Sequence, residues 1–207
     1  MQLLDGKKVA QNLYEELRNE VARLQKGGIQ TKFALILIGE DPASLSYIKQ
    51  KRKASEQIGV VTEYIHLKPE EVTNESMLKL IEKLNQDLEI FGILVQLPMP
   101  KHLDKEKIIR AIDPKKDVDG FHPINVGRVA LGIDAYVSAT PLGITKILER
   151  YNIATEGKNY VVIGRSNIVG RPMSILMSGS GKTGNATVTV CHSKTKNLKE
   201  ICLQDDI

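Results

Sequence analysis

Phe33-Ala34-Leu35-Ile36-Leu37-Ile38 is an unbroken apolar run of the length of a β-strand. A strand that is apolar on both faces is typical of a parallel sheet covered by helices on each side. Apolar residues spaced three or four apart precede it and predict one face of a helix that ends at Gly27-Gly28, namely Val9, Leu13, Leu17, Val21 and Leu24. After the run, a polar helix is expected over about residues 44–58, closed by Gly59. The run therefore indicates the centre of an α/β domain.

Helical and extended patterns continue to alternate after this strand. Strands are expected over residues 60–67 and 92–95, and helices from Thr73 to Leu84 and from Leu103 to Ile112. Residues 115–139 have weak periodicity, which indicates mostly loop with one short helix near Val126. Strands that alternate with helices favour a parallel sheet with helical crossovers.

A second set of alternating elements begins near Thr140, where Pro141 suits the first position of a helix that runs to Tyr151. The elements expected beyond it are a strand over 158–163, a helix over 169–178, a strand over 186–190 and a helix from Asn197. The chain stops at Asp206-Ile207, where another strand is expected. We therefore predict an α/β protein with two domains, residues 1–139 and 140–207.

Composition excludes several classes of protein. The chain has 207 residues, 42% of them hydrophobic and 26% charged, as in ordinary soluble proteins rather than disordered or fibrous ones. A net charge of +4 is too small to indicate nucleic-acid binding. Cys191 and Cys202 form neither a disulfide framework nor a metal-binding pair, and Met1 to Gly6 lacks the apolar run of a signal peptide. No stretch approaches the ~18 apolar residues of a membrane span, so we expect a cytoplasmic protein without a metal.

The stretch Tyr160 to Pro172 reads as a strand, a turn with glycines and the start of a helix. Gly164 allows a sharp turn, Gly170 allows the helix to pack close to the sheet, and free N–H groups at the helix start attract an anion. The spacing differs from the usual Gly-x-Gly-x-x-Gly of dinucleotide sites. Arg165 suits a 2′-phosphate, which favours NADP over NAD. A structural turn with a solvated arginine explains the spacing equally well.

Two further stretches of the second half bear on nucleotide binding. Cys191-His192-Ser193 follows a predicted strand, so its polar groups would face the same edge of the sheet, although loop-capping chemistry is the simpler reading of these residues alone. Gly179-Ser180-Gly181-Lys182-Thr183 imitates the end of a P-loop. A P-loop needs glycine where Leu176 stands and must follow a strand, whereas this stretch follows a helix. We expect a flexible loop there.

The first half carries a basic helix, Tyr47-Ile48-Lys49-Gln50-Lys51-Arg52-Lys53. Tyr47 and Lys51 are four residues apart and share a helix face, so an aromatic ring and an amine could together stack a flat ligand and transfer a proton. Neighbouring cations and partial burial favour the neutral amine that a lysine base needs. A solvated cationic face is the usual alternative for such a run.

Polar side chains also follow the third predicted strand and the loop after it. Gln96, in Val95-Gln96-Leu97-Pro98, places an amide at a strand end, where it faces a ligand or satisfies loop backbone groups. Asp117 and Asp119, in Lys116-Asp117-Val118-Asp119-Gly120, offer carboxylates that could hold the adjacent donors of a heterocycle. Turn and capping chemistry is the alternative, above all for Asp117.

Taken together, these motifs resemble the bifunctional methylenetetrahydrofolate dehydrogenase/methenyltetrahydrofolate cyclohydrolase family. The match runs in order through Leu4-Asp5-Gly6-Lys7, Asp41-Pro42-Ala43-Ser44, Tyr47-x-x-x-Lys51-x-Lys53, Val95 to Pro98, Lys116 to Gly120, Thr140-Pro141-x-Gly143, Val162 to Pro172 and Cys191 to Thr195. Any one motif is weak, but their order over nearly the whole chain is highly specific.

The resemblance implies two α/β domains flanking a cleft, a folate-binding catalytic domain over residues 1–139 and an NADP-binding domain over residues 140–207. Because family members continue beyond the position of Ile207, the second domain would be the N-terminal part of an incomplete Rossmann-type domain. The implied reactions are oxidation of 5,10-methylenetetrahydrofolate by NADP+ and hydrolysis of the 5,10-methenyl product to 10-formyltetrahydrofolate, in one-carbon metabolism. The resemblance also implies a homodimer.

Site residues follow from the same resemblance. The implied catalytic residues are Lys51 as the proton-transfer group, Gln96 orienting it, Tyr47 stacking on the aminobenzoyl ring and Asp119 gripping the pteridine. The substrate-binding set adds Leu97, Pro98, Pro141 and Gly143. The cofactor-binding set is Gly164, Arg165, Ser166, Ile168, Gly170, Pro172, His192 and Ser193. The alternatives are a truncated, catalytically impaired folate-binding module and another NADP oxidoreductase whose first domain merely looks similar.

Overall fold

The computed structural model describes residues 3–207 and separates into two compact units. Residues 10–118 form one, here named the N-terminal unit; residues 3–9 and 119–207 form the other, here named the C-terminal unit. Met1 and Gln2, which belong to the N-terminal stretch considered above, lie outside the described residues. The chain therefore changes unit twice, and each unit is described by itself.

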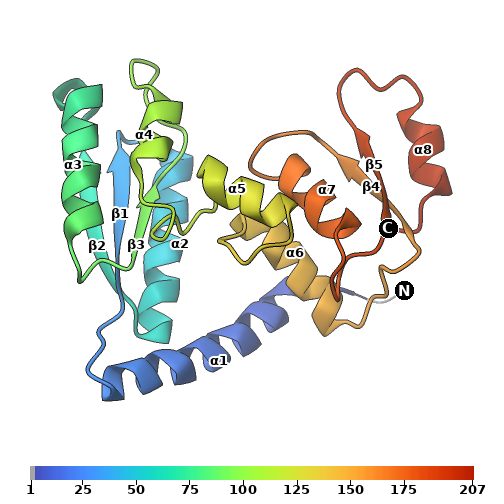
Figure 1. Ribbon diagram of the computed structural model, residues 1–207, viewed down its shortest axis with the longest axis horizontal. Helices are drawn as coiled ribbons and strands as arrows, with labels where there is room; N and C mark the ends of the chain where they lie inside the picture. Colours follow the sequence, from blue (N-terminus) through green and yellow to red (C-terminus); the bar gives the residue numbers. More distant parts are fainter. Residues whose placement is uncertain (1–2) are drawn as a thin grey trace. The chain divides into compact units, whose positions relative to one another are not determined.

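The N-terminal unit is built on a parallel sheet in the order β2-β1-β3 (Figure 1). Its strands are β1 (Lys32–Ile38), β2 (Val61–Leu67) and β3 (Gly92–Val95). The predicted apolar strand is the central one, and residues 34–37 are at most 1% exposed. A parallel bridge between Ile93 and Asp117 extends the sheet beyond β3. The sequence indicated only loop at Asp117, because a single bridge leaves no alternation of apolar residues.

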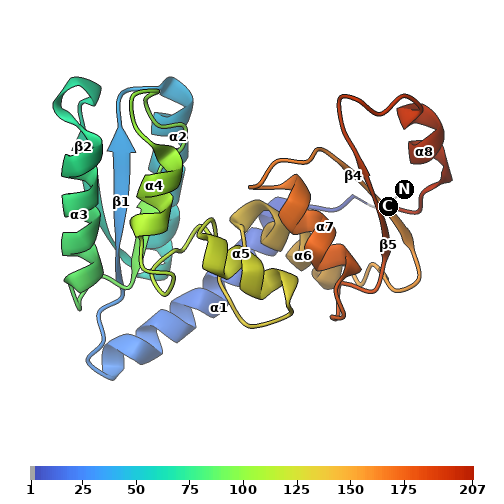
Figure 2. The same cartoon turned by 45° about the horizontal axis from the view of Figure 1, so that its top comes forward.

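Helices cover both faces of this sheet, as the unbroken apolar strand predicted (Figures 1 and 2). On one face, Ile48 of α2 (Pro42–Ile58) packs against Leu35 and Leu37 of β1. On the other, α3 (Asn74–Gln86) and α4 (Lys105–Ala111) pack Met77, Ile81 and Ile108 against Ala34 and Ile36. A short 3₁₀ helix, Pro69–Glu71, follows β2. Alternate residues of β1 thus enter two separate apolar clusters.

Local signals set the ends of the two long helices that flank β1. Asp41 caps α2 by accepting the Ser44 N–H at 2.8 Å, which lowers the pKa of the Asp41 carboxyl. Gly59 ends α2 with φ of 84°, the left-handed conformation that glycine adopts without strain. Thr73 and Ser76 form a reciprocal capping box at the start of α3.

The C-terminal unit places parallel strands β4 (Asn159–Ile163) and β5 (Thr187–Cys191) side by side. Its helices are α5 (Pro123–Ala130), α6 (Ala139–Arg150), α7 (Gly170–Ser178) and α8 (Leu198–Gln204). The predicted short helix near residue 126 is α5. Tyr160 and Val162 of β4 form an apolar cluster with Leu148, Met173 and Met177 of α6 and α7.

The chain end lies along the other edge of β4. The Val161 N–H donates to the Ile207 carbonyl at 2.9 Å, and the Ile207 N–H donates to the Asn159 carbonyl at 3.2 Å. This is the pattern of parallel pairing. Residue 207 therefore pairs with the backbone of β4, at the point of the sequence where a further strand was expected.

Helix α6 starts two residues earlier than predicted. Ser138 is its N-cap residue, so Pro141 is the third residue of the helix rather than the first. Proline is tolerated there because the N–H groups of the first helical turn have no intrahelical partner. The Leu142 N–H, one residue later, makes the first helical hydrogen bond, to the Ser138 carbonyl at 3.1 Å.

Helix α1 (Gly6–Lys26) begins in the C-terminal unit and continues in the N-terminal unit. Val9 in the first and Val21 in the second are each 6% exposed, whereas Leu17 between them is 46% exposed. The apolar face predicted from the spacing is therefore covered at its two ends and open in its middle.

The first turn of α1 is fixed to the end of α6. The Asp5 N–H donates to the Tyr151 hydroxyl at 2.9 Å. Gly6 lies against the Ile147 side chain, since a Cβ at Gly6 would be 3.4 Å from it. The Asp5 carboxylate accepts the N–H groups of Lys7 and Lys8. Asp5 and Gly6 are thus an integral part of the C-terminal unit.

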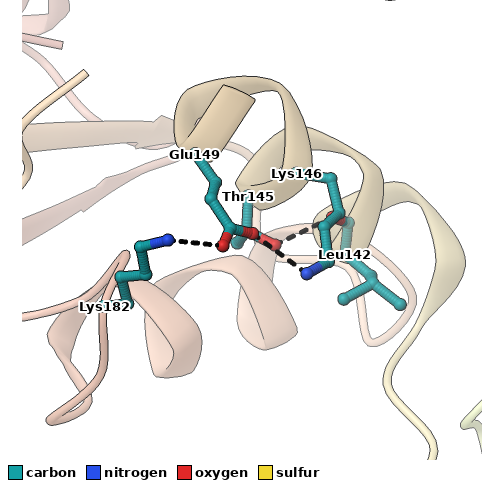
Figure 3. Close-up of polar contacts among 5 residues, drawn as sticks. All are labelled: Leu142, Thr145, Lys146, Glu149 and Lys182. Atoms are coloured by element: carbon teal, nitrogen blue, oxygen red, sulfur yellow. Dashed lines mark hydrogen bonds and ion pairs between the residues drawn. The ribbon is translucent and has the colours of Figure 1, made fainter. Parts of the chain in front are cut away.

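The loop that imitates a P-loop is tied to α6 by an ion-pair cluster (Figure 3). Lys182 Nζ lies 2.9 Å from one carboxylate oxygen of Glu149, and Lys146 Nζ lies 3.0 Å from the other. The loop follows α7 and not a strand, so it is not a P-loop, and Lys182 forms an ion pair with Glu149. Hydrogen bonds from Lys182 and then Lys146 lower the pKa of Glu149 to about 2.

This cluster predicts an acid-dependent contribution to stability. A carboxyl whose pKa falls on folding stabilises the native state above its ordinary pKa near 4.5 and loses that effect as pH falls towards about 2. We expect E149Q to lower Tm by about 3 °C at neutral pH, the effect of a surface ion pair worth about 1 kcal/mol. The Tm difference from wild type should shrink as pH falls from about 4.5 to about 2.

The matched control is E75Q, which removes an exposed carboxylate 2.8 Å from Lys79 on α3. Both side chains of that pair are more than 75% exposed, so its loss should shift Tm by less than about 1 °C. Thermal unfolding of the three proteins over the pH range is the measurement. An E149Q difference that stays constant with pH would contradict the role assigned to the cluster.

Candidate functional site

A lysine and an amide meet at the carboxyl end of the sheet in the N-terminal unit. Lys51 of α2 donates from Nζ to Oε1 of Gln96 at 3.1 Å, and both side chains are half-buried. Gln96 directly follows β3, and its backbone N–H donates to the Ile36 carbonyl at 2.8 Å, so the strand fixes its position. Its Nε2 donates to the Leu97 carbonyl at 2.8 Å. Because the amide nitrogen is engaged there, the amide oxygen is the atom that faces Lys51.

The basic side chains of α2 point in different directions and have different surroundings. Arg52 lies over the ring of Tyr64, with Cζ 5.2 Å from the ring centroid. Burial raises the pKa of the Tyr64 hydroxyl. Lys49 and Lys53 are exposed. The solvated-face reading therefore suits Lys49 and Lys53, while Lys51 has a specific partner.

Tyr47 lies one turn before Lys51 on the same helix, as the four-residue spacing predicted. Tyr47 is 60% exposed. An exposed aromatic ring beside an oriented amine can stack on a flat ligand. Leu97 and Pro98, after Gln96, are half-buried and exposed respectively and are joined by a cis peptide bond.

The two aspartates of the 116–120 stretch have different surroundings. Asp117 is 2% exposed and forms the bridge to Ile93, which agrees with the structural alternative considered for it. Asp119, two residues later, is half-buried and begins the C-terminal unit. Pro141, buried, and Gly143, exposed, belong to that unit as well. The structure thus places Tyr47, Lys51, Gln96, Leu97 and Pro98 in the N-terminal unit, and Asp119, Pro141 and Gly143 in the C-terminal unit.

In the C-terminal unit, the turn after β4 and the loop after β5 start at the same edge of the sheet. Ile163 pairs with Cys191, and the Gly164 N–H donates to the Cys191 carbonyl at 2.8 Å. Gly164 has φ of 131°, a conformation that side chains rarely permit. Arg165 and the His192-Ser193 pair therefore follow neighbouring strand ends, and Arg165 and Ser193 are exposed.

The start of α7 differs from the expectation of free N–H groups. The Ser166 hydroxyl oxygen accepts the N–H of Val169 at 3.1 Å and that of Gly170 at 3.4 Å. Ser166 acts as a local cap, so these two donors are already satisfied within the chain. An anion at this turn must rely on other groups, of which the exposed Arg165 guanidinium is one.

Gly170 is required by close packing at this turn. A Cβ at this position would lie 2.2 Å from the Gly164 carbonyl oxygen and 2.8 Å from the Arg165 backbone nitrogen. The helix start therefore touches the backbone of the turn that follows β4, as the sequence predicted. Pro172, in the first turn of α7, is buried, and Ile168 before it is 41% exposed.

Sequence reasoning missed Ser138, which is 4% exposed and donates its hydroxyl to the Ile168 carbonyl. This bond ties the dinucleotide-type turn to the start of α6. A serine just before a predicted helix usually signals an N-cap, but here its hydroxyl makes no capping bond. The loop after β5 is closed by its own bonds, with the His192 N–H donating to Thr195 Oγ1 at 2.9 Å and the Lys194 N–H to His192 Nδ1 at 3.2 Å.

These features define the chain as a two-unit α/β protein whose C-terminal unit has the strand–turn–helix arrangement typical of dinucleotide-binding domains. Within residues 3–207, no three His, Cys, Asp or Glu side chains are grouped so that they could hold a metal ion. The model of the tetrahydrofolate dehydrogenase/cyclohydrolase catalytic domain matches residues 4–119, and that of the NAD(P)-binding domain of the same family matches residues 138–207. The chain belongs to the tetrahydrofolate dehydrogenase/cyclohydrolase family.

Individual relatives agree with this membership. The bifunctional protein FolD of Porphyromonas gingivalis is 50% identical over 206 residues, covering 99% of this chain and 69% of the relative. A crystal structure of the bifunctional FolD enzyme from Campylobacter jejuni has a TM-score of 0.95 at 46% identity, covering 100% of this chain and 72% of that one. The Trypanosoma brucei FolD, complexed with NADP cofactor and inhibitor, has a TM-score of 0.90 at 32% identity, covering 98% and 68%.

Proposed function

We propose that Lys51, Gln96, Tyr47 and Asp119 carry out the folate chemistry of this chain. Because of its family membership, the chain is a methylenetetrahydrofolate dehydrogenase and methenyltetrahydrofolate cyclohydrolase that uses NADP. It oxidises 5,10-methylenetetrahydrofolate to the 5,10-methenyl cation and hydrolyses this cation to 10-formyltetrahydrofolate. The hydrogen bond of 3.1 Å from Lys51 Nζ to Gln96 Oε1 is the observation that carries the assignment of residues.

The hydrolysis needs a group that accepts a proton. Water adds to the methenyl carbon, one of its protons passes to a base, and cleavage of one C–N bond then returns a proton to the ring nitrogen. Lys51 Nζ, which gives one hydrogen to Gln96 Oε1, is the group placed to take the water proton. Gln96 thereby positions the lysine, and Tyr47 on the same helix face supports the aromatic part of the substrate.

The turn after β4 fits a phosphorylated dinucleotide. A Cβ at Gly164 would have nothing within 4 Å, so a ligand can approach the backbone there, and the Arg165 guanidinium is exposed beside it. We assign the cofactor to Gly164, Arg165, Ser166, Ile168, Gly170, Pro172, His192 and Ser193, with Arg165 and Ser193 toward the 2′-phosphate. When bound, NADP+ accepts the hydride that the methylene carbon loses. Pro141 and Gly143 are assigned to the substrate side.

The division of labour between the domains, the assembly and the compartment are further proposals. Folate chemistry is assigned to residues 1–139 and NADP binding to residues 140–207, supported by the family-model limits at 119 and 138. A homodimer through the C-terminal unit is supported by exposed apolar side chains such as Leu203, 74% exposed. The free thiols of Cys191 and Cys202 agree with a cytoplasmic location. No helix within residues 3–207 is long and apolar enough to cross a membrane. Sedimentation velocity measures the assembly.

Two separate assays test the function. Incubation with 5,10-methylenetetrahydrofolate and NADP+ should produce reduced nicotinamide, and methenyltetrahydrofolate alone should be hydrolysed faster than in buffer. Folate binding without either turnover would favour an impaired folate-binding module. Turnover of NADP+ with other substrates and no folate affinity would favour an unrelated oxidoreductase.

Q96E tests the lysine–amide pair specifically. A carboxylate in place of the amide oxygen would bind Lys51 Nζ in an ion pair and compete with the reacting water for it. We expect hydrolysis of methenyltetrahydrofolate to fall about tenfold. The control Q57E makes the same charge change at an exposed position of α2 and should keep hydrolysis within about twofold of wild type. Wild-type hydrolysis by Q96E would contradict the pairing.

A further inference from the structure

The side chain of Lys116 binds the carboxyl end of α3. Its ammonium group donates to the backbone carbonyls of Leu84 at 2.9 Å, Asn85 at 2.7 Å and Asp87 at 2.7 Å. These three bonds use all three hydrogens of the ammonium group. The last carbonyls of a helix lack helical partners and carry a partial negative charge, so a cation is favourable there. Lys116 is half-buried, and its position is therefore set by α3.

The backbone around Lys116 is fixed to β3 as well. The Lys116 carbonyl accepts the Ile93 N–H at 2.7 Å, and Asp117 forms the parallel bridge to Ile93. Val118 packs so closely on Gly92 that a Cβ at Gly92 would lie 2.4 Å from Val118 Cγ1. Residues 116–118 thus lie along β3, held by the backbone on one side and by the lysine side chain on the other.

The segment leads directly to Asp119, which follows Val118 in the chain. We propose that Lys116 is a positioning residue for folate recognition, because its three bonds to the end of α3 fix where the Asp119 carboxylate leaves the sheet. The inference rests on the proposed binding of the pteridine by Asp119. Partial burial of the Lys116 ammonium group costs dehydration of a charge. In return, its bonds fix residues 116–118, which would otherwise be held to the sheet by the backbone bridge to Ile93.

Asn85 provides a matched control at the same helix end. Its side chain donates to the Ala111 carbonyl at 2.8 Å and accepts the Asp113 N–H at 2.9 Å. It therefore fixes the end of α4 to α3 without contacting residues 116–118 through its side chain. N85A removes two hydrogen bonds from the same region and should lower Tm while leaving folate affinity intact.

The experiment measures the Kd of tetrahydrofolate and of NADP, and Tm, for wild type, K116M, N85A, D119N and the K116M/D119N double variant. K116M should weaken tetrahydrofolate binding about tenfold, since displacement of a binding group by about 1 Å is enough for a loss of this size. NADP affinity should stay unchanged, and N85A should keep wild-type folate affinity within about twofold. K116Q, which retains two donor hydrogens, replaces K116M in the series if K116M does not fold.

The double variant separates the positioning role of Lys116 from the binding role of Asp119. If Lys116 acts through Asp119, adding K116M to D119N should cause almost no further loss of tetrahydrofolate affinity. A full tenfold loss in the D119N background would overturn the positioning role and leave the role of Asp119 intact. Unchanged folate affinity in D119N itself would overturn the proposed function of Asp119 and this inference with it. Equal folate losses in N85A and K116M would also overturn it, as a general effect of stability.

Discussion

Lys51→Met is expected to reduce hydrolysis of methenyltetrahydrofolate about 1,000-fold, within the range that a positioned base contributes. Methionine has nearly the length of lysine and keeps the half-buried stem packed, but it cannot accept the water proton or bind Gln96. The dissociation constant of NADP should not change, because Arg165 and Gly170 belong to the other unit. Stopped-flow hydrolysis of the methenyl compound and isothermal titration with NADP measure the two effects.

The control for this variant is Lys53→Met. Lys53 lies two residues further along α2 and is exposed, so its loss removes the same charge without touching Gln96. Hydrolysis by Lys53→Met should remain within about twofold of wild type, since exposed charges act weakly at a distance. Unchanged hydrolysis in Lys51→Met, with wild-type Tm, would remove Lys51 from the mechanism.

Gly170→Ala is expected to weaken NADP binding about 100-fold and to abolish measurable dehydrogenase activity. The added methyl carbon would lie 2.2 Å from the Gly164 carbonyl oxygen, and backbone atoms cannot rotate away as a side chain can. The turn between β4 and α7 must therefore shift, at a cost of about 1–3 kcal/mol of stability. Hydrolysis of methenyltetrahydrofolate should persist, because Lys51 and Gln96 lie in the other unit.

Gly127→Ala is the matched control for that substitution. Gly127 lies inside α5, where a Cβ would meet nothing within 4 Å. Alanine is the better helix former by about 1 kcal/mol, so this variant should be as stable as wild type or slightly more so. Normal NADP affinity in Gly170→Ala would show that the turn does not hold the cofactor. Parallel loss of hydrolysis and oxidation would point to general unfolding.

The elements that the sequence predicted best are those that carry their own periodicity. The apolar run of β1 could be interpreted because its two faces are both buried, and the glycine turn of Gly164 and Gly170 because only glycine fits there. In both of these cases a local pattern already contains the physical cause. The pairing of Lys51 with Gln96 was implied by the family resemblance, whereas the helix face and the strand end indicated only that each side chain could face a ligand.

Other features depend on partners that are distant in sequence. The bridge of Asp117 to Ile93 leaves no pattern in a polar stretch, and the bond from the Ser138 hydroxyl to Ile168 replaces the cap that its position suggested. Ser166 takes up the helix N–H groups that were expected to await an anion. Such choices among equally plausible hydrogen-bond partners are made by tertiary packing, which no short motif records.

The bond between Asp5 and Tyr151 bears on any attempt to dissect the molecule. A cut between residues 118 and 119 would separate residues 3–9 from the unit to which they belong. An isolated 119–207 fragment would therefore lack the contact of Gly6 with Ile147 and the hydrogen bond from Asp5 to Tyr151. A permuted gene that fuses residues 3–9 to this fragment through a short linker would restore those contacts. Fragment-complementation studies should therefore keep residues 3–9 together with residues 119–207.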